Sequence, residues 1–235
     1  MCNQKPELNQ KPDKNAPIGV FDSGVGGLTV AREIMRQMPE ERIVYFGDTA
    51  RVPYGSKSQD TIIRYSRQII RFLMTKHVKA IVIACNTASA YALATVEKEF
   101  DVPIIGVIRA GARTAVQVTR NGKIGVIATE GTIGSGIYTQ EIKKLRPDIE
   151  VTGKPCPLFV PLVEEGLLHD SVTDEIASRY LSSLKSRFVD TLVLGCTHYP
   201  LIRSTLGRLM GNDVTLVNPA YETAIELRDL LQKYG

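Results

Sequence analysis

The sequence predicts an α/β protein made of two similar three-layer α/β/α domains with mostly parallel sheets, related by pseudo-twofold symmetry. Short β-branched runs alternate with longer amphipathic segments from Ile18 onward, which is typical of parallel strands joined by crossover helices. The second half of the chain repeats the motifs of the first in the same order. Hydrophobic residues at 43% and charged residues at 23% match an ordinary globular chain. We therefore expect an active site in the cleft between two domains.

Each predicted strand is a short apolar run that precedes a segment of helical periodicity. The predicted strands are 18–21, 43–46, 80–84, 104–108, 124–127, 149–152, 191–194 and 214–217. The predicted helices are 28–37, 59–76, 89–99, 111–118, 137–145, 172–186, 201–209 and 222–232. A strand followed by a helix eight times over is the pattern of a parallel sheet.

Four pairs of motifs recur between the two halves at a nearly constant offset. They are IGVFDSGVGGLTVAREI with IGVIATEGTIGSGIYTQEI, IVIACNTASA with LVLGCTHYPL, GVIRAGARTA with TLVNPAYETA, and Val52-Pro53 with Val160-Pro161. Four ordered matches indicate a duplicated unit. We expect a first domain of residues 18–110 plus 221–235, and a second domain of residues 111–220.

Composition narrows the class of protein. Residues 1–17 are polar and charged without an apolar stretch, so we expect a flexible tail and no signal peptide. The net charge of +4 is scattered, and no apolar run spans a bilayer, so neither nucleic-acid binding as the main function nor a membrane partner is expected. Four widely spaced cysteines without a CxxC pair favour a cytoplasmic protein with no metal site.

Polar residues cluster where predicted strands end, the edge at which parallel sheets bind ligands. The predicted strands 18–21, 43–46, 80–84 and 191–194 are each followed by such a group. In this order the groups are Asp22 and Ser23; Tyr54, Gly55 and Ser56; Cys85, Asn86 and Thr87; and Cys196, Thr197 and His198. Two sheets facing each other about a twofold axis would bring these edges together. All of these residues are therefore candidates for one site.

The duplication supplies two thiols, Cys85 and Cys196, in equivalent positions at predicted helix N-termini. A helix N-terminus favours thiolate and can lower the thiol pKa from about 8.5. Two thiols on opposite walls suit removal of a proton from one face of a carbon and its return to the other, which is racemisation or epimerisation. Asp22 and His198 would assist the thiols. Ser23, Asn86, Thr87, Thr197 and the helix N-termini would hold carboxylates, and no pyridoxal site is evident.

The motifs DSGVGGLTV, GDTARVPYGS, ACNTASA, FVPLVEEG and LGCTHYPL resemble those of glutamate racemases in the cofactor-independent aspartate/glutamate racemase superfamily. The resemblance covers Pro17 to the C-terminus. It implies interconversion of L- and D-glutamate by a Cys85–Cys196 acid/base pair, with D-glutamate passing to peptidoglycan synthesis. It implies no cofactor, a homodimer, and a further catalytic candidate, Glu164, beside His198.

Two alternatives remain. The substrate could be aspartate or another small amino acid, because the motifs at the sheet edges define the chemistry better than the side-chain pocket. The chain could also be a ligand-binding or protein-interaction module on the same scaffold, which would bind without turnover. Cys156, flanked by prolines, is interpreted as structural, and His77 and His169 as surface or capping residues. Glu164 and Glu165 would otherwise lie in a solvated loop.

Overall fold

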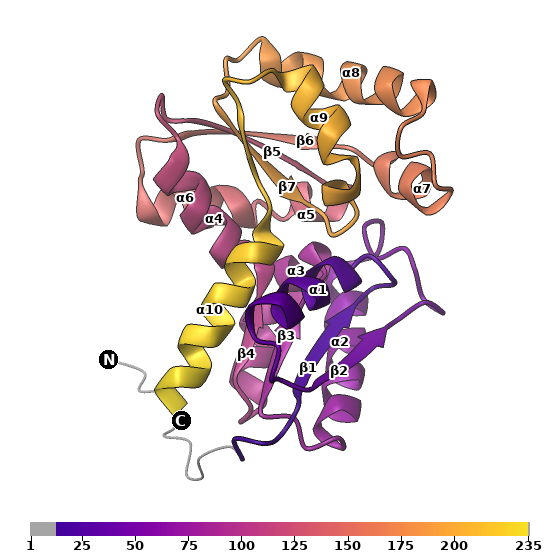
Figure 1. Ribbon diagram of the computed structural model, residues 1–235, viewed down its shortest axis with the longest axis vertical. Helices are drawn as coiled ribbons and strands as arrows, with labels where there is room; N and C mark the ends of the chain where they lie inside the picture. Colours follow the sequence, from indigo (N-terminus) through magenta and orange to yellow (C-terminus); the bar gives the residue numbers. More distant parts are fainter. Residues whose placement is uncertain (1–12, 235) are drawn as a thin grey trace.

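The computed structural model describes residues 13–234 and contains two four-stranded sheets. The first has the order β2-β1-β3-β4 and the second the order β6-β5-β7-β8, and every paired strand is parallel. The strands are β1 (Ile18–Asp22), β2 (Ile43–Gly47), β3 (Ala80–Ile83), β4 (Ile104–Gly106), β5 (Lys123–Ala128), β6 (Glu150–Pro155), β7 (Thr191–Gly195) and β8 (Thr215–Val217). The predicted fold class is confirmed, and the common strand order agrees with the sequence repeat (Figure 1).

Helices connect the strands and cover both faces of each sheet. They are α1 (Leu28–Gln37), α2 (Gln59–Met74), α3 (Asn86–Glu99), α4 (Val107–Val118), α5 (Glu130–Gly134), α6 (Ile137–Leu145), α7 (Phe159–Glu164), α8 (Ser171–Lys185), the 3-10 helix η1 (Tyr199–Ile202), α9 (Arg203–Met210) and α10 (Pro219–Tyr234). None of the helices in residues 13–234 combines the length and the apolar character needed to cross a membrane.

Three apolar cores lie between the two sheets and the helices that cover them. In β3, Ile81 and Ile83 face a core shared with α2 and α3, whereas Ala80 and Val82 face a central core shared with α1, α4 and α10. The central core continues into β5 through Val126, and a third core lies between the other face of the second sheet and helices α7 to α9. Because successive strand residues alternate between two packed faces, both sheets are buried, as parallel sheets require.

The last helix follows the last strand of the second sheet and returns to α1 of the first half of the chain. Helix α10 packs against α1 and α4, and it runs beside the first domain in Figure 1. The bounds of the two domains stay a prediction, because α4 (Val107–Val118) crosses the expected boundary at residue 110. Most of the predicted tail lies outside the described residues. Of its described part, Ala16 is buried, and the Lys14 carbonyl accepts a hydrogen bond of 2.6 Å from Lys79 Nζ.

Several predicted boundaries were wrong, and two of the errors affect the site. Helix α3 begins at Asn86, directly after Cys85, whereas the sequence pattern placed its start at Ser89. Polar residues in a first helical turn carry no apolar periodicity, so the pattern missed them. Helix α7 was also missed because six residues are too few to show a period, and Glu164 ends this helix instead of lying in a loop.

Three other differences concern connections. Val107 and Ile108 were predicted to extend a strand, but Gly106 caps α4 and both residues are buried in the central core by that helix. Their β-branched side chains resemble a strand in sequence although they lie on a helix. Helix α5 was not predicted, and the predicted helix 201–209 is divided into η1 and α9.

Candidate active site

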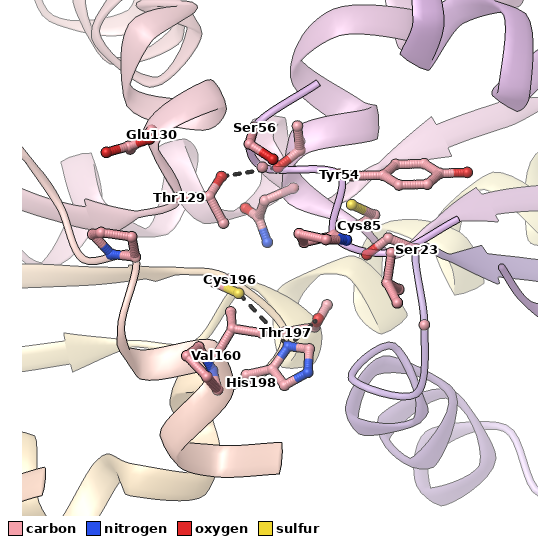
Figure 2. Close-up of a pocket in the computed structure, with 18 of the residues that line it drawn as sticks. Ser23, Tyr54, Ser56, Cys85, Thr129, Glu130, Val160, Cys196, Thr197 and His198 are labelled. Atoms are coloured by element: carbon pink, nitrogen blue, oxygen red, sulfur yellow. Dashed lines mark hydrogen bonds between the residues drawn. The ribbon is translucent and has the colours of Figure 1, made fainter. Parts of the chain in front are cut away.

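A cavity of about 350 Å³ lies between the two domains, at the edge where the strands of both sheets end. Its walls come from both halves of the chain, and Figure 2 shows Cys85 and Cys196 on different sides of it. The first domain contributes Ser23, Gly24, Val52, Pro53, Tyr54, Gly55, Ser56, Cys85, Asn86 and Thr87. The second contributes Thr129, Glu130, Pro157, Val160, Pro161, Glu164, Cys196, Thr197 and His198. Except for Asp22, every candidate residue from the sequence therefore lines one cavity.

Cys85 is the residue that caps the N-terminus of α3. Its Sγ accepts the backbone N–H of Ala88 at 3.4 Å, and the thiol is free and only 5% exposed. Burial, together with the nearby charge of Asp22, raises the pKa of Cys85 to about 11, against the lowering effect of hydrogen bonds from Ala88 and Ser23. The resting Cys85 is consequently a thiol at neutral pH.

Cys196 follows β7 and is followed by a histidine that reaches back toward it. The Cys196 Sγ lies 3.8 Å from Nδ1 of His198, and His198 Nε2 lies 3.0 Å from Oε1 of Glu164. Burial is the main cause that raises the pKa of Cys196. A backbone hydrogen bond from His198 opposes the shift, and the charges of Asp22 and Glu164, and of Cys85 when it is ionised, add to it. These three side chains form a line from the partly exposed Glu164 carboxylate to the buried sulfur.

The expected lowering of the two thiol pKa values is wrong for the resting protein. Each sulfur is almost fully buried, and desolvation disfavours the thiolate by more than one helix N-terminus or a few N–H donors can offset. A buried thiol in this state can donate a proton, but it would need a neighbouring base to take its own proton before it could remove one from a carbon atom.

Asp22 lies behind the cavity wall instead of lining it. The side chain is completely buried, and its Oδ2 accepts the backbone N–H groups of Gly24 and Gly27 at 3.1 and 3.0 Å. Among the described residues, no donor reaches Oδ1. Burial raises the pKa of Asp22, with the backbone N–H donors and His198 opposing the shift. The neighbouring Ser23 does line the cavity.

The loop that follows β2 places Tyr54, Gly55 and Ser56 in the wall. The Tyr54 hydroxyl donates to Asp48, which also pairs with Arg51 at 2.8 Å, so the phenol is directed away from the cavity toward a buried carboxylate. The Gly55 carbonyl accepts the backbone N–H of Gly131 at 2.9 Å. This loop is thus attached to both domains.

Polar contacts cross the cleft around the start of α3. The Thr87 hydroxyl lies 2.9 Å from that of Thr129 and 3.2 Å from that of Thr132, and the Tyr138 hydroxyl donates to Asn86 Oδ1 at 2.7 Å. Thr87 and Asn86 belong to the first domain, whereas their three partners come from the second. The two walls are therefore joined directly beside Cys85.

A second set of contacts joins the domains beside Cys196. The Thr29 hydroxyl donates to the carbonyl of Thr197 at 3.1 Å. A Cβ atom on Gly26 would lie 2.5 Å from Cε1 of His198, so only a glycine leaves room for the imidazole. Helix α1 and the turn before it consequently hold Thr197 and His198 of the other domain.

The sequence pattern missed several residues of the wall. Thr129 and Glu130 follow β5, Pro157 precedes α7, and Val160 and Pro161 lie in that helix. Three of these could have been found from the repeat, because Thr129 aligns with Ser23 and Val160-Pro161 aligns with Val52-Pro53. Gly24 and the Val52-Pro53 pair also line the cavity. These three residues have no polar side-chain group that would have marked them as candidates in the sequence.

The arrangement suits proton transfer at a carbon atom. Two thiols from different domains share a cavity, each has a nearby carboxylate or imidazole, and hydroxyl and amide groups line the remaining walls. In residues 13–234 we find no cluster of three or more His, Cys, Asp or Glu side chains arranged to bind a metal ion.

Comparison with known proteins agrees with this geometry. The family model described as Asp/Glu/Hydantoin racemase matches residues 18–225. The glutamate racemase of Geobacter metallireducens is 53% identical over 215 residues, which cover 92% of this chain and 80% of that protein. These matches confirm the family resemblance predicted from the motifs.

Solved structures give the same result. A glutamate racemase of Bacillus anthracis superimposes with a TM-score of 0.93 at 45% identity, covering 95% of this chain and 84% of that one. The glutamate racemase of Francisella tularensis in complex with D-glutamate gives a TM-score of 0.88 at 43% identity, covering 94% of this chain and 82% of that one. The two-domain arrangement is therefore that of solved racemases.

Proposed function

The chain belongs to the Asp/Glu/Hydantoin racemase family and is an amino-acid racemase, and we propose that it interconverts L- and D-glutamate through Cys85 and Cys196 without a cofactor. One observation carries the mechanism: two free, buried thiols from different domains line a single cavity. The substrate assignment is supported by the relatives, among them the F. tularensis enzyme, whose structure contains D-glutamate.

In the proposed reaction one sulfur takes the Cα proton as a thiolate while the other gives its proton to the opposite face of the carbon. The C–H bond broken and the C–H bond formed balance, and the thiols exchange protonation states. The reverse reaction starts from the state left by the forward one. Exchange of the thiol protons with neighbouring bases returns the enzyme to either state.

Because both thiols are protonated at rest, we assign each a base. His198 Nδ1 would accept the proton of Cys196, while Nε2–H donates to Glu164, whose charge stabilises the imidazolium. Asp22 would act on Cys85, since its carboxylate is close enough to shift the pKa of that thiol and has one oxygen without a donor among the described residues. Asp22 therefore acts through Cys85 from behind the wall.

The remaining polar groups would bind the two carboxylates and the amine. Ser23, Asn86, Thr87 and Thr197, with Tyr54, Gly55, Ser56 and His198, surround the space between the sulfurs. Hydrogen-bond donors that are held in place before the reaction stabilise the negative charge that develops at Cα, which is the difficult part of removing a weakly acidic proton. The helix α3 N-terminus contributes further N–H groups.

The test combines racemisation, followed by circular dichroism, with Cα exchange in deuterated water. Each glutamate enantiomer should give a product that carries solvent deuterium, and turnover without deuterium in the product would contradict the two-base mechanism. Cys85→Ala and Cys196→Ala should each abolish racemisation. Cys156→Ala is the matched control, because Cys156 is a buried thiol of the third core outside the cavity. An active Cys85 or Cys196 variant would mean that the pair is misassigned.

A substrate panel separates the alternatives. Faster turnover of aspartate or another small amino acid than of glutamate would replace the substrate assignment. Binding of glutamate without turnover by the unmodified protein would favour a ligand-binding module, against which both intact thiols argue.

The cellular role and assembly are part of the same proposal. Supply of D-glutamate for peptidoglycan synthesis in the cytoplasm predicts that the chain restores growth of a bacterial strain that requires D-glutamate. A homodimer is expected from the resemblance, and light scattering coupled to size-exclusion chromatography measures it directly.

A further inference from the structure

Tyr138 contacts the site without lining the cavity. It lies on α6 of the second domain, is 3% exposed, and its hydroxyl donates to Oδ1 of Asn86 in the first domain at 2.7 Å. Asn86 is the residue after Cys85, is 5% exposed and does line the cavity. A buried hydrogen bond therefore connects the second domain to a side chain that faces the substrate space.

The same tyrosine also lies against the strand that leads to the other thiol. A Cβ atom on Gly195 would lie 3.2 Å from Cε2 of the Tyr138 ring, so the ring packs closely on the residue before Cys196. Tyr138 thus contacts the residue that follows one thiol and the residue that precedes the other.

The hydrogen bond has a chemical consequence for Asn86. Its amide has one accepting oxygen and one donating NH₂ group, and a carboxylate can only accept. When the oxygen is occupied by the Tyr138 hydroxyl, the NH₂ group is the end left for a substrate. Burial raises the pKa of Tyr138, which keeps the phenol protonated and able to donate.

We infer that Tyr138 is a positioning residue: its hydroxyl holds the Asn86 amide with the NH₂ group toward a substrate carboxylate. This inference rests on the proposed function, since it assumes a substrate with a carboxylate in the cavity. Without the hydroxyl, the amide could turn and present its oxygen to that carboxylate, which would repel it.

Tyr138→Phe removes only the hydroxyl. We expect the KM for both glutamate enantiomers to rise about tenfold with a smaller change in kcat, because ground-state binding of the carboxylate is weakened. The decisive measurement is a double-mutant cycle with Asn86→Ala, read as kcat/KM and as the Kd of glutamate by calorimetry. In the Asn86→Ala background, Tyr138→Phe should change either quantity by less than about twofold.

Tyr199→Phe is the matched control. Tyr199 is also buried in the second domain, and its hydroxyl donates to the Cys156 carbonyl at 2.8 Å, so its loss perturbs the fold in a similar way. Its effect should be the same with and without Asn86→Ala. An equal loss from Tyr138→Phe in both Asn86 backgrounds would overturn the inference.

Asn86→Asp tests the amide orientation without altering Tyr138. The variant keeps an oxygen for the Tyr138 hydroxyl but replaces NH₂ by a second acceptor, so glutamate should bind more weakly than to Asn86→Ala. Binding as tight as in the unmodified protein would also overturn the inference. Failure of the unmodified protein to racemise glutamate would instead contradict the proposed function, so the two failures are distinguishable.

Discussion

The Nε2 atom of His198 lies 3.0 Å from Oε1 of Glu164, while the other ring nitrogen lies 3.8 Å from the sulfur of Cys196. With a proton on Nε2, the ring donates to the carboxylate and directs the lone pair of Nδ1 at the thiol. The ring can then take the proton that the buried thiol must lose. In the mechanism we propose, the base of Cys196 is therefore a pair of residues, of which Glu164 orients the ring and stabilises its charged form.

Glu164→Gln keeps an acceptor for Nε2–H but removes the negative charge. We expect kcat to fall about 10- to 100-fold, because the imidazolium formed from His198 is less stabilised. The enantiomers have equal free energies, so kcat/KM must fall by the same factor in both directions while the two kcat values can differ. Initial rates from L- and D-glutamate measure this.

Glu165→Gln is the control for this change. Glu165 is the exposed neighbour of Glu164, and its replacement removes one charge at almost the same place on the surface. Its rate should match that of the unmodified protein. If both variants lost activity equally, the effect would come from the general field of the site and not from the contact with His198.

Asp22→Asn should separate activity from stability. The amide oxygen can still accept the N–H groups of Gly24 and Gly27, but the charge beside Cys85 is lost, so we expect kcat to fall about 100-fold. Burial disfavours the charged form of Asp22. Removing the charge should therefore leave the free energy of unfolding unchanged or higher.

Urea denaturation and racemisation rates test both parts for Asp22→Asn and for Asp101→Asn, an exposed aspartate of the same domain. The control should change neither quantity. A large loss of stability in Asp22→Asn would show that the aspartate has a structural role, and full activity would remove it from the proposed mechanism.

The positions of the two thiols could be predicted from the sequence because the residues next to each cysteine identify the end of a strand. Cys85 and Cys196 both follow an apolar strand and precede polar residues, and the repeat equates them, so topology alone places them at facing edges. Their electrostatics could not be predicted in this way. The burial that raises the pKa of Cys85 comes from tertiary packing around the thiol, which no local pattern describes.

Contacts between the domains could not be predicted from the sequence pattern either. Tyr138 appears only as one apolar position in a helical period, and Gly26 as one more glycine of a tight turn. What makes them part of the site is a partner from the other domain, which neither periodicity nor motif spacing describes. Helix α7 was missed for the related reason that a short helix is stabilised by tertiary packing.

Gly26→Ala should impair catalysis by displacing the imidazole. The added methyl group would lie 2.5 Å from Cε1 of His198 and from Oγ1 of Thr197. Real side chains do not approach so closely, so we expect the imidazole to shift and its contact with Cys196 to change. We expect kcat/KM to fall at least about tenfold.

Gly134→Ala provides the comparison, because a Cβ atom there meets no atom within 4 Å and Gly134 ends helix α5. It should retain full activity and equal or slightly greater stability, since alanine reduces the freedom of the unfolded chain. Equal activity of the two variants would mean that the contact between Gly26 and His198 is not needed.

The raised thiol pKa predicts how stability depends on pH. Cys85 has a pKa of about 11 in the folded protein and about 8.5 in an unfolded chain, so below pH of about 8.5 both states hold the proton. Above it the unfolded state releases its proton first, and the stabilising contribution is lost progressively until the pH passes about 11. One such thiol lowers the free energy of unfolding by up to about 1.4 kcal/mol per pH unit in this range.

Urea denaturation at pH 8, 9 and 10 should therefore show a shallower decline for Cys85→Ala than for the unmodified protein. Other groups titrate in this range as well, so the difference between the two slopes is the quantity to compare. Ser66→Ala serves as the control because it removes a buried side chain that does not titrate here, and its slope should equal that of the unmodified protein. Identical slopes for all three proteins would contradict the raised pKa of Cys85 and, with it, the need for a base beside that thiol.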